Sequence, residues 1–283
     1  MRLHRFFVKN KINIDERVTL RFFDYDSILG QWKKVFRYLA GSRVILFDGS
    51  GMDFLCIIER FDNNGAVLRV LESYKTSGEE VKKAEKTKKT GAGNNVGEVL
   101  ENIATQERGV TLIMSLIKND NFDLVLQKAT ELGVNQIVPI ITERTIKKDL
   151  NMTRSQRILV EASEQCGRSD VPVIVPPRKL TDVLRDLPIG KQVDKQVDKQ
   201  IGTFVCNQNG LNIRDILGKS GVKGSAKNKK LTDLIFIIGP EGGWSPKEIK
   251  LFDELKITPL KISQNVLRAE TAAIALLGQL FVV

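Results

Sequence analysis

The sequence LIFIIGPEGGWSPKE occupies residues 234–248 and is the clearest indication of the architecture of the chain. Its first five residues are apolar and are followed by turn formers, which is typical of a strand buried on both faces of a parallel sheet. Ser245 and Glu248 have the spacing of a capping box, and Pro246 takes the first helical position, where its missing N–H costs nothing. The stretch therefore predicts a strand, a glycine-rich loop and the start of a helix.

The glycine-rich loop at residues 239–243 is a candidate ligand site. Glycines let the backbone approach a ligand beyond the carboxyl end of a strand, where open α/β sheets bind their ligands. The loop lacks the Lys-Ser/Thr pair of a phosphate loop and the Gly-x-Gly-x-x-Gly dinucleotide fingerprint. Glu241 also disfavours a phosphate, because like charges repel in a partly dry pocket. A cationic or phosphate-free cofactor fits better, and a plain connection without a ligand is the alternative.

Strand-like runs and helical stripes alternate over residues 110–283. The expected elements are strands at 110–117, 134–141, 171–175 and 203–206, a helix at 122–132, and a helix to about residue 166 capped by Thr153 and Gln156. This alternation predicts an α/β domain, with a mostly parallel sheet and helices on both faces. Low-complexity stretches near 188–200 and 219–230 are expected to be surface insertions.

The chain ends in a helix that is apolar nearly all round and must be buried against the sheet or a second subunit. Its start is polar, with Arg268, Glu270 and Thr271. These side chains are candidate catalytic residues, although Arg268 and Glu270 could simply form an ion pair with each other at the N-terminus of the helix.

Residues 1–73 are mostly β in pattern. Strand-like runs at 18–22, 43–47, 54–58 and 66–70 are separated by turn signals. The exception is a helix predicted at 27–39 and capped by Asp26 or Ser27. Its expected inward face carries Ile28, Leu29, Trp32, Val35, Phe36 and Leu39. A small β-barrel with one helix is the expected assembly. It could bind nucleic acid or be a purely structural accessory domain. Residues 74–109 are expected to be a linker.

Composition limits the possible functions of the 283-residue chain. It has a single histidine, so neither a histidine metal cluster nor a Ser-His-Asp triad can form, and its three cysteines are not spaced for a metal; we expect no metal site. No apolar run is long enough to span a membrane and no secretory signal is present, which favours the cytoplasm. The net charge of +10 favours a polyanionic partner, most commonly nucleic acid, although a lysine-rich surface is the simpler reading.

Five motifs together resemble the ribosomal RNA small subunit methyltransferase E family, a branch of the SPOUT methyltransferases. Two are the glycine loop and the ending VLRAETA at 266–272. The other three are RFFV at 5–8, QKATELGV at 127–134 with Pro139 and Glu143-Arg144 after it, and EASEQCGR at 161–168. All five occur in the order of the family.

The resemblance implies a SPOUT methyltransferase domain with a C-terminal trefoil knot, preceded by a small PUA-like barrel that helps to bind RNA. It also implies a homodimer that transfers a methyl group from S-adenosylmethionine to N3 of one uridine in 16S ribosomal RNA. A sulfonium cofactor without phosphate agrees with the presence of Glu241. The residues that this resemblance implies for cofactor binding are Cys206, Asn207, Gly239, Pro240, Gly242, Gly243, Ile262, Val266, Leu267 and Thr271.

The implied reaction removes the proton of an imide nitrogen and develops negative charge on the base. Our hypothesis is that Arg268 stabilises this anion and that Glu270 or Glu241 accepts the proton, with water as the alternative. The residues expected to contact RNA are Arg5, Arg144, Gln165 and Arg168. Two other functions stay open: a non-catalytic RNA-binding or ribosome-assembly protein, and a SPOUT methyltransferase that acts on transfer RNA or on a ribose 2′-hydroxyl.

Overall fold

A computed structural model describes residues 3–75, 109–187, 200–212 and 231–281 of the chain. The predicted linker at 74–109 and the predicted insertions near 188–200 and 219–230 lie almost entirely outside these ranges. The described residues form two compact units. The first contains residues 3–75 and 160–171, and the second contains residues 109–159 and the described residues from 172 onward.

The first unit is built on a five-stranded sheet that curves as a half-barrel. Its first two strands in space are parallel, and the remaining neighbours are antiparallel. The strands in spatial order are β1 (Arg5–Phe7), β3 (Arg43–Phe47), β4 (Met52–Asp62), β5 (Gly65–Lys75) and β2 (Val18–Arg21). The four predicted strands are therefore confirmed, with β4 and β5 longer than expected.

The helix of this unit differs from the prediction. It begins five residues early as α1 (Phe22–Gln31), which is kinked at Tyr25, where the backbone is not helical (φ −133°, ψ 31°), and it continues as a π-helix, η1 (Trp32–Phe36). The residues after the kink correspond to the predicted start of the helix, although the residue that precedes α1 is Arg21 and not Asp26 or Ser27. Arg37 adopts a left-handed conformation with φ of 53° and ends the helix before Leu39. The predicted inward positions Leu29 and Trp32 are buried, together with Tyr25, and Ile28 and Phe36 pack against the same core. Val35 and Leu39 are 68% and 73% exposed, so their predicted inward positions are wrong: Val35 lies in the π-helix, where the α-helical spacing does not hold, and Leu39 lies beyond the end of the helix.

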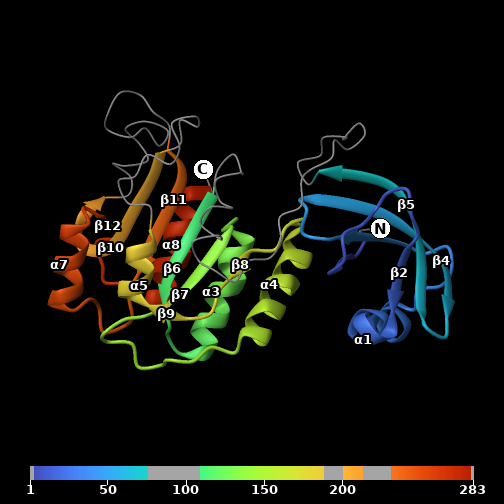
Figure 1. The fold of residues 1–283 in the computed structure, drawn as a ribbon, viewed down its shortest axis with the longest axis horizontal. Coiled ribbons are helices and arrows are strands. Elements are labelled where there is room, and N and C mark those ends of the chain that lie inside the picture. The colour runs from blue at the N-terminus through green and yellow to red at the C-terminus, as the bar shows by residue number, and fades with distance from the viewer. Residues whose placement is uncertain (1–2, 76–108, 188–199, 213–230, 282–283) are drawn as a thin grey trace. The chain divides into compact units, whose positions relative to one another are not determined.

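The second unit contains a seven-stranded sheet in which every pair of neighbouring strands is parallel, as predicted (Figure 1). The spatial order is β12 (Thr258–Lys261), β10 (Gln200–Asn212), β11 (Leu231–Ile238), β6 (Gly109–Ser115), β7 (Gln136–Ile141) and β8 (Val173–Ile174), and β9 (Arg178–Lys179) also pairs with β7. Parallel strands buried under helices are apolar throughout, which is why β6 has no exposed residue.

Helices cover both faces of this sheet. The short helix α5 (Leu180–Asp186) and α7 (Pro246–Glu254) share a core with Ile235 and Ile237 of β11. The buried residues of α3 (Asn119–Glu131) and α8 (Ala269–Phe281) lie outside that core, and these helices contact each other, with α8 also contacting β11. The C-terminal helix therefore buries one side, which includes Ala273, Leu276 and Leu277, whereas Ile274 and Leu280 are only partly buried.

The two predicted capping boxes have different outcomes. At α7 the box is present: the Glu248 N–H donates to Ser245 Oγ at 3.3 Å, and the Ser245 N–H donates to Glu248 Oε2 at 2.8 Å. At α4 (Met152–Cys166) the box of Thr153 is wrong, because the helix has already begun at Met152. Asn151 caps it instead, since its Oδ1 accepts from the Arg154 N–H at 3.0 Å.

Candidate functional site

The irregular stretch of β10 that follows Val205, where its pairing with β11 ends, and the loops at the carboxyl ends of β11 and β12 surround a cavity of about 440 Å³. Parallel strands bring these ends to one edge of the sheet, and the start of α8 completes the wall. This volume is typical of a small-molecule site. The lining residues are Cys206, Asn207, Gln208, Ile238, Gly239, Pro240, Glu241, Gly243, Trp244, Ile249, Leu260, Ile262, Ser263, Asn265, Val266, Leu267, Arg268, Ala269 and Ala272.

The structure brings most of the sequence-predicted cofactor residues to this cavity. Gly242 and Thr271 do not line it, and both are exposed. Those that line it are Cys206, Asn207, Gly239, Pro240, Gly243, Ile262, Val266 and Leu267. Three loops that are separate in the sequence therefore meet around one space.

The glycine loop follows β11 as a tight turn. The Gly243 N–H donates to the Pro240 carbonyl at 2.9 Å, and Gly243 has a φ of 68°, a left-handed conformation that favours glycine. At Gly239 a Cβ atom would lie 2.9 Å from the ring of Trp244. Glycine is required at both positions, at one for the backbone conformation and at the other for close packing.

Trp244 is a cavity residue that the sequence reasoning did not identify. Its Nε1 donates to the Cys206 carbonyl at 3.0 Å, and its ring meets Phe252 of α7 edge-on at 4.9 Å between centroids. One side chain therefore links the end of β10, the glycine loop and α7. Trp244 directly follows the last glycine of the loop and directly precedes the cap residue Ser245, and this position is the sequence feature that could have identified it as a cavity residue.

The loop between β12 and α8 is hydrogen-bonded to Gln208 of β10. Gln208 Nε2 donates to the Asn265 carbonyl at 3.2 Å, and the Asn265 N–H donates to Ser263 Oγ at 3.2 Å. Gln208, Ser263 and Asn265 all line the cavity. Ser263 and Asn265 lie in the stretch 262–267 that the family resemblance implies for cofactor binding, whereas Gln208 was not predicted.

The predicted catalytic residues lie in different surroundings. Arg268 and Glu241 are exposed and line the cavity. Glu270 does not line it; its carboxylate is buried, and Oε1 accepts from Asn121 Nδ2 of α3 at 3.2 Å. In the part of the chain that the structure describes, Arg268 forms no ion pair with Glu270, so the two side chains do not neutralise each other at the helix mouth.

The thiol of Cys206 is not poised for nucleophilic chemistry. Burial raises the pKa of Cys206 to about 12, so the thiol stays protonated at neutral pH. Over the described residues, no group of three or more His, Cys, Asp or Glu side chains is arranged to hold a metal ion. None of the described helices combines the length and the apolar character needed to cross a bilayer.

The four residues predicted to contact RNA are distributed over both units. Arg144, in the second unit, is exposed and its Nη1 donates to the carbonyl of Gly242 at 2.7 Å. Gln165, on α4 in the first unit, is exposed. Arg168, just after α4, has its guanidinium on the carboxylate of Asp170, with Nη2 2.6 Å from Oδ2.

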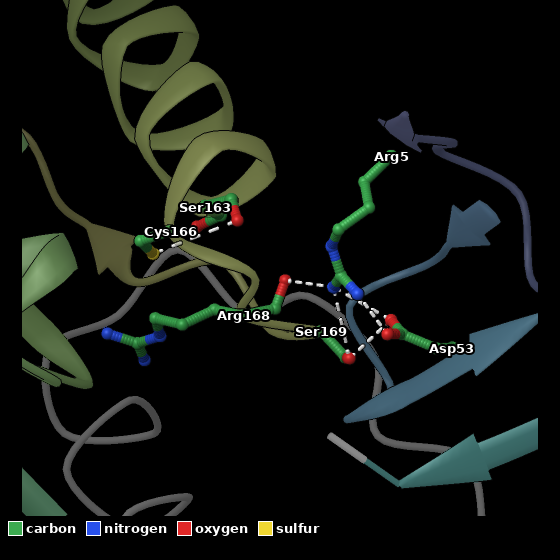
Figure 2. A network of polar contacts seen from close by, with 6 residues as sticks. All are labelled: Arg5, Asp53, Ser163, Cys166, Arg168 and Ser169. Atoms are coloured by element: carbon green, nitrogen blue, oxygen red, sulfur yellow. Dashed lines mark hydrogen bonds and ion pairs between the residues drawn. The ribbon is translucent and has the colours of Figure 1, made fainter. Parts of the chain in front are cut away.

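Arg5 lies in an internal polar network of the first unit (Figure 2). Its guanidinium pairs with the buried carboxylate of Asp53 and donates to the Arg168 carbonyl at 2.8 Å and to Ser169 Oγ at 3.3 Å. Ser169 Oγ in turn donates to Asp53. The structure therefore gives Arg5 a place in the interior of the unit, where it holds the end of α4 and the following loop against β1 and β4.

Comparison with known proteins identifies close counterparts of this architecture. A family model described as an RNA methyltransferase domain matches residues 105–280. The ribosomal RNA small subunit methyltransferase E of Rickettsia conorii is 26% identical over 280 residues, covering 99% of this chain and 95% of the relative.

Two solved structures match nearly the whole chain. A ribosomal RNA small subunit methyltransferase E from Neisseria gonorrhoeae bound to S-adenosyl methionine has a TM-score of 0.70 at 24% identity, covering 98% of this chain and 96% of that one. A putative methyltransferase from Legionella pneumophila in complex with the bound cofactor SAM has a TM-score of 0.70 at 25% identity, covering 99% and 97%.

Proposed function

Because this chain belongs to the RNA methyltransferase domain family, we propose that it transfers a methyl group from S-adenosylmethionine to N3 of a uridine in 16S ribosomal RNA. The α/β fold with its parallel sheet is that of a SPOUT-type methyltransferase. The observation on which this proposal rests is the cavity beside β10, β11 and β12, which is lined by Arg268 and Glu241. The name of the Rickettsia relative supports a small-subunit ribosomal RNA substrate.

The residues of the cavity fit S-adenosylmethionine. The cofactor has no phosphate, and the glycine loop offers neither a phosphate-loop lysine nor an anion-binding pattern. Apolar side chains such as Ile238, Leu260 and Val266 provide a surface for an adenine ring, and backbone groups of residues 239–243 and 262–267 provide polar contacts. The carboxylate of Glu241 complements the positive charge of a sulfonium. When bound, the cofactor supplies a methyl group activated by that sulfonium charge.

Arg268 and Glu241 would perform the chemistry that the substrate requires. The guanidinium of Arg268 stabilises negative charge as the imide proton leaves the base, and a preorganised charge of this kind is worth roughly 3–4 kcal/mol in the transition state. Glu241 is the better-placed proton acceptor, since its carboxylate is exposed at the cavity. The carboxylate of Glu270 already accepts a hydrogen bond from Asn121 and does not line the cavity. Water is the alternative acceptor.

The finer points of the architecture belong to the same proposal. We expect the segment from Ile262 onward to be tucked through a loop as a trefoil knot; its support is that residues 262–268 share one cavity with the loops after β10 and β11. We expect the half-barrel to be part of a PUA-like RNA-binding domain, Gln165 and Arg168 to contact RNA, and the enzyme to act as a cytoplasmic homodimer.

The test is methylation of small-subunit ribosomal RNA by the purified protein with labelled S-adenosylmethionine, followed by mass analysis of the nucleosides. We expect N3-methyluridine at one position. A methyl group on a ribose hydroxyl or in transfer RNA would contradict the proposed substrate. RNA binding without methyl transfer or cofactor binding would instead indicate a ribosome-assembly protein.

A further inference from the structure

The segment after β7, residues 142–145, is built as a rigid turn. Three buried hydroxyl groups hold it: Ser115 Oγ and Thr145 Oγ1 lie 2.8 Å apart, and Thr142 Oγ1 and Thr145 Oγ1 lie 2.8 Å apart. Thr145 Oγ1 also accepts from the Thr142 N–H at 2.9 Å. Because buried polar groups that are bonded in this way are costly to displace, the turn presents its neighbouring residues in fixed positions.

The same turn is joined to the start of α7 by Glu248. The carboxylate is 7% exposed, and its Oε1 accepts from the Glu143 N–H at 2.9 Å while its Oε2 accepts from the Ser245 N–H at 2.8 Å. The carboxylate of Glu248 therefore accepts hydrogen bonds from both the turn and the cap residue of α7. Because Ser245 follows the glycine loop closely, these bonds anchor the chain on the C-terminal side of the loop to the turn at 142–145.

Arg144 extends from this turn onto the glycine loop. Its Nη1 donates to the Gly242 carbonyl at 2.7 Å, and a Cβ on Gly242 would lie 3.3 Å from Arg144 Cβ, so the arginine side chain lies directly against the glycine backbone. Gly242 stands inside the turn that the Gly243 N–H closes on the Pro240 carbonyl. The bond therefore acts on the two consecutive glycines that have the greatest conformational freedom in the loop.

We propose that Arg144 is a positioning residue that holds the glycine loop in its binding conformation through the Gly242 carbonyl, in place of the RNA contact suggested by the sequence. This role rests on the proposed function, because the loop it holds is the proposed cofactor wall. Preorganisation of a loop raises affinity by removing part of the ordering cost of binding. Arg144 does not line the cavity, so it acts on the cofactor through Gly242 alone.

The test measures the binding of S-adenosylmethionine in the absence of RNA by calorimetry. Arg144→Ala is expected to weaken binding about tenfold, the range of one hydrogen bond made by a charged donor. Backbone amides of residues 239–244 are expected to exchange hydrogen faster in the ligand-free variant. Lys148→Ala is the matched control: it removes a charge from an exposed residue of the same segment and should change neither measurement. Arg144→Lys, which keeps a donor, should recover most of the affinity.

Two other outcomes would each contradict a different conclusion, the role of Arg144 or the proposed function. Unchanged cofactor affinity and unchanged exchange in Arg144→Ala, together with weaker RNA binding and a salt-dependence slope smaller by about one, would make Arg144 an RNA contact. A wild-type protein that did not bind S-adenosylmethionine would refute the proposed function. In that case the exchange rates of the ligand-free variants would still decide whether Arg144 holds the loop.

Discussion

Arg5 in the first unit and Arg268 in the second show two opposite uses of a basic side chain. The side chain of Arg5 is 11% exposed and is paired with Asp53, which is 1% exposed. Arg268 is exposed at the cavity and, among the described residues, forms no ion pair. A buried paired charge maintains structure, because its partner would otherwise be left unpaired, whereas a single charge beside a cavity is available to a ligand. The two sites should therefore respond differently to mutation.

The largest effect is expected for Arg268→Ala. If Arg268 stabilises the developing anion as we propose, its removal should lower kcat for methyl transfer by about 10²–10³-fold. Because the side chain is exposed, the melting temperature and the affinity for S-adenosylmethionine should stay close to those of the wild type. Steady-state turnover measures kcat, calorimetry measures the affinity and thermal unfolding measures the melting temperature. Wild-type turnover in the variant would remove Arg268 from the reaction.

Asp53→Ala is expected to lower stability and to leave cofactor binding intact, which is the reverse of the result expected for Arg268→Ala. It leaves the guanidinium of Arg5 buried and unpaired, which should lower the free energy of unfolding by about 3–5 kcal/mol. Denaturant unfolding measures this loss, and affinity for the cofactor should be retained by the folded protein. The double variant Arg5→Met/Asp53→Leu removes both charges and should lose much less. A loss equal to that of the single variant would show that packing, and not the ion pair, is the main contribution.

A smaller effect is expected for Gly239→Ala. The added methyl group would lie 2.9 Å from the Trp244 ring, so the ring must shift and weaken its bond to the Cys206 carbonyl. We expect cofactor affinity to fall about tenfold, corresponding to roughly 1.4 kcal/mol. Gly30→Ala is the control, since a Cβ there meets no atom within 4 Å. Equal affinities in the two variants would mean that the packing of Trp244 does not shape the cavity.

The smallest effect concerns Glu164, whose Oε1 accepts from the Phe7 N–H at 2.8 Å in the first unit. Burial raises the pKa of Glu164 from 4.5 to about 7, against the opposing effect of the Phe7 N–H. The folded state therefore holds more protons than the unfolded state between these values, so stability falls as pH rises from 4.5 to about 7 and then levels off.

Glu164→Gln keeps the acceptor and mimics the protonated form. It should be more stable than the wild type by about 1–3 kcal/mol at pH 8 and by less than about 1 kcal/mol at pH 5, as thermal unfolding at the two pH values can measure. A difference that did not change with pH would show that Glu164 is not the titrating group.

The strands, and the loops that follow them, could be predicted from the sequence because each is indicated by residues that are close together in the chain. The apolar run at 234–238 and the capping box of Ser245 depend on residues within one or two turns. The spatial neighbours of a polar side chain depend on distant segments instead. Nothing in the residues around Arg5 or Arg144 indicated that one would pair with Asp53 and the other would reach Gly242.

The same limit explains the helix of the first unit and the missed cavity residues. A helical stripe at 27–39 gave no sign of the left-handed Arg37 that ends the helix, because apolar spacing indicates which residues face inward and not the backbone conformation of one residue. Gln208 is an ordinary polar residue until the parallel sheet brings β10 and β12 together. The resemblance to a known family supplied the third loop, which periodicity alone did not.

The burial of Cys206 has a practical consequence for spectroscopy. Thiolates are the species that react with maleimides and iodoacetamides, and burial raises the pKa values of both Cys206 and Cys56 to about 12. Cys166, by contrast, is exposed near the end of α4. A fluorophore or spin label should therefore attach at Cys166 alone in the native protein, without any cysteine being engineered or removed. The chain carries its own single attachment point for following α4 in a test of RNA binding.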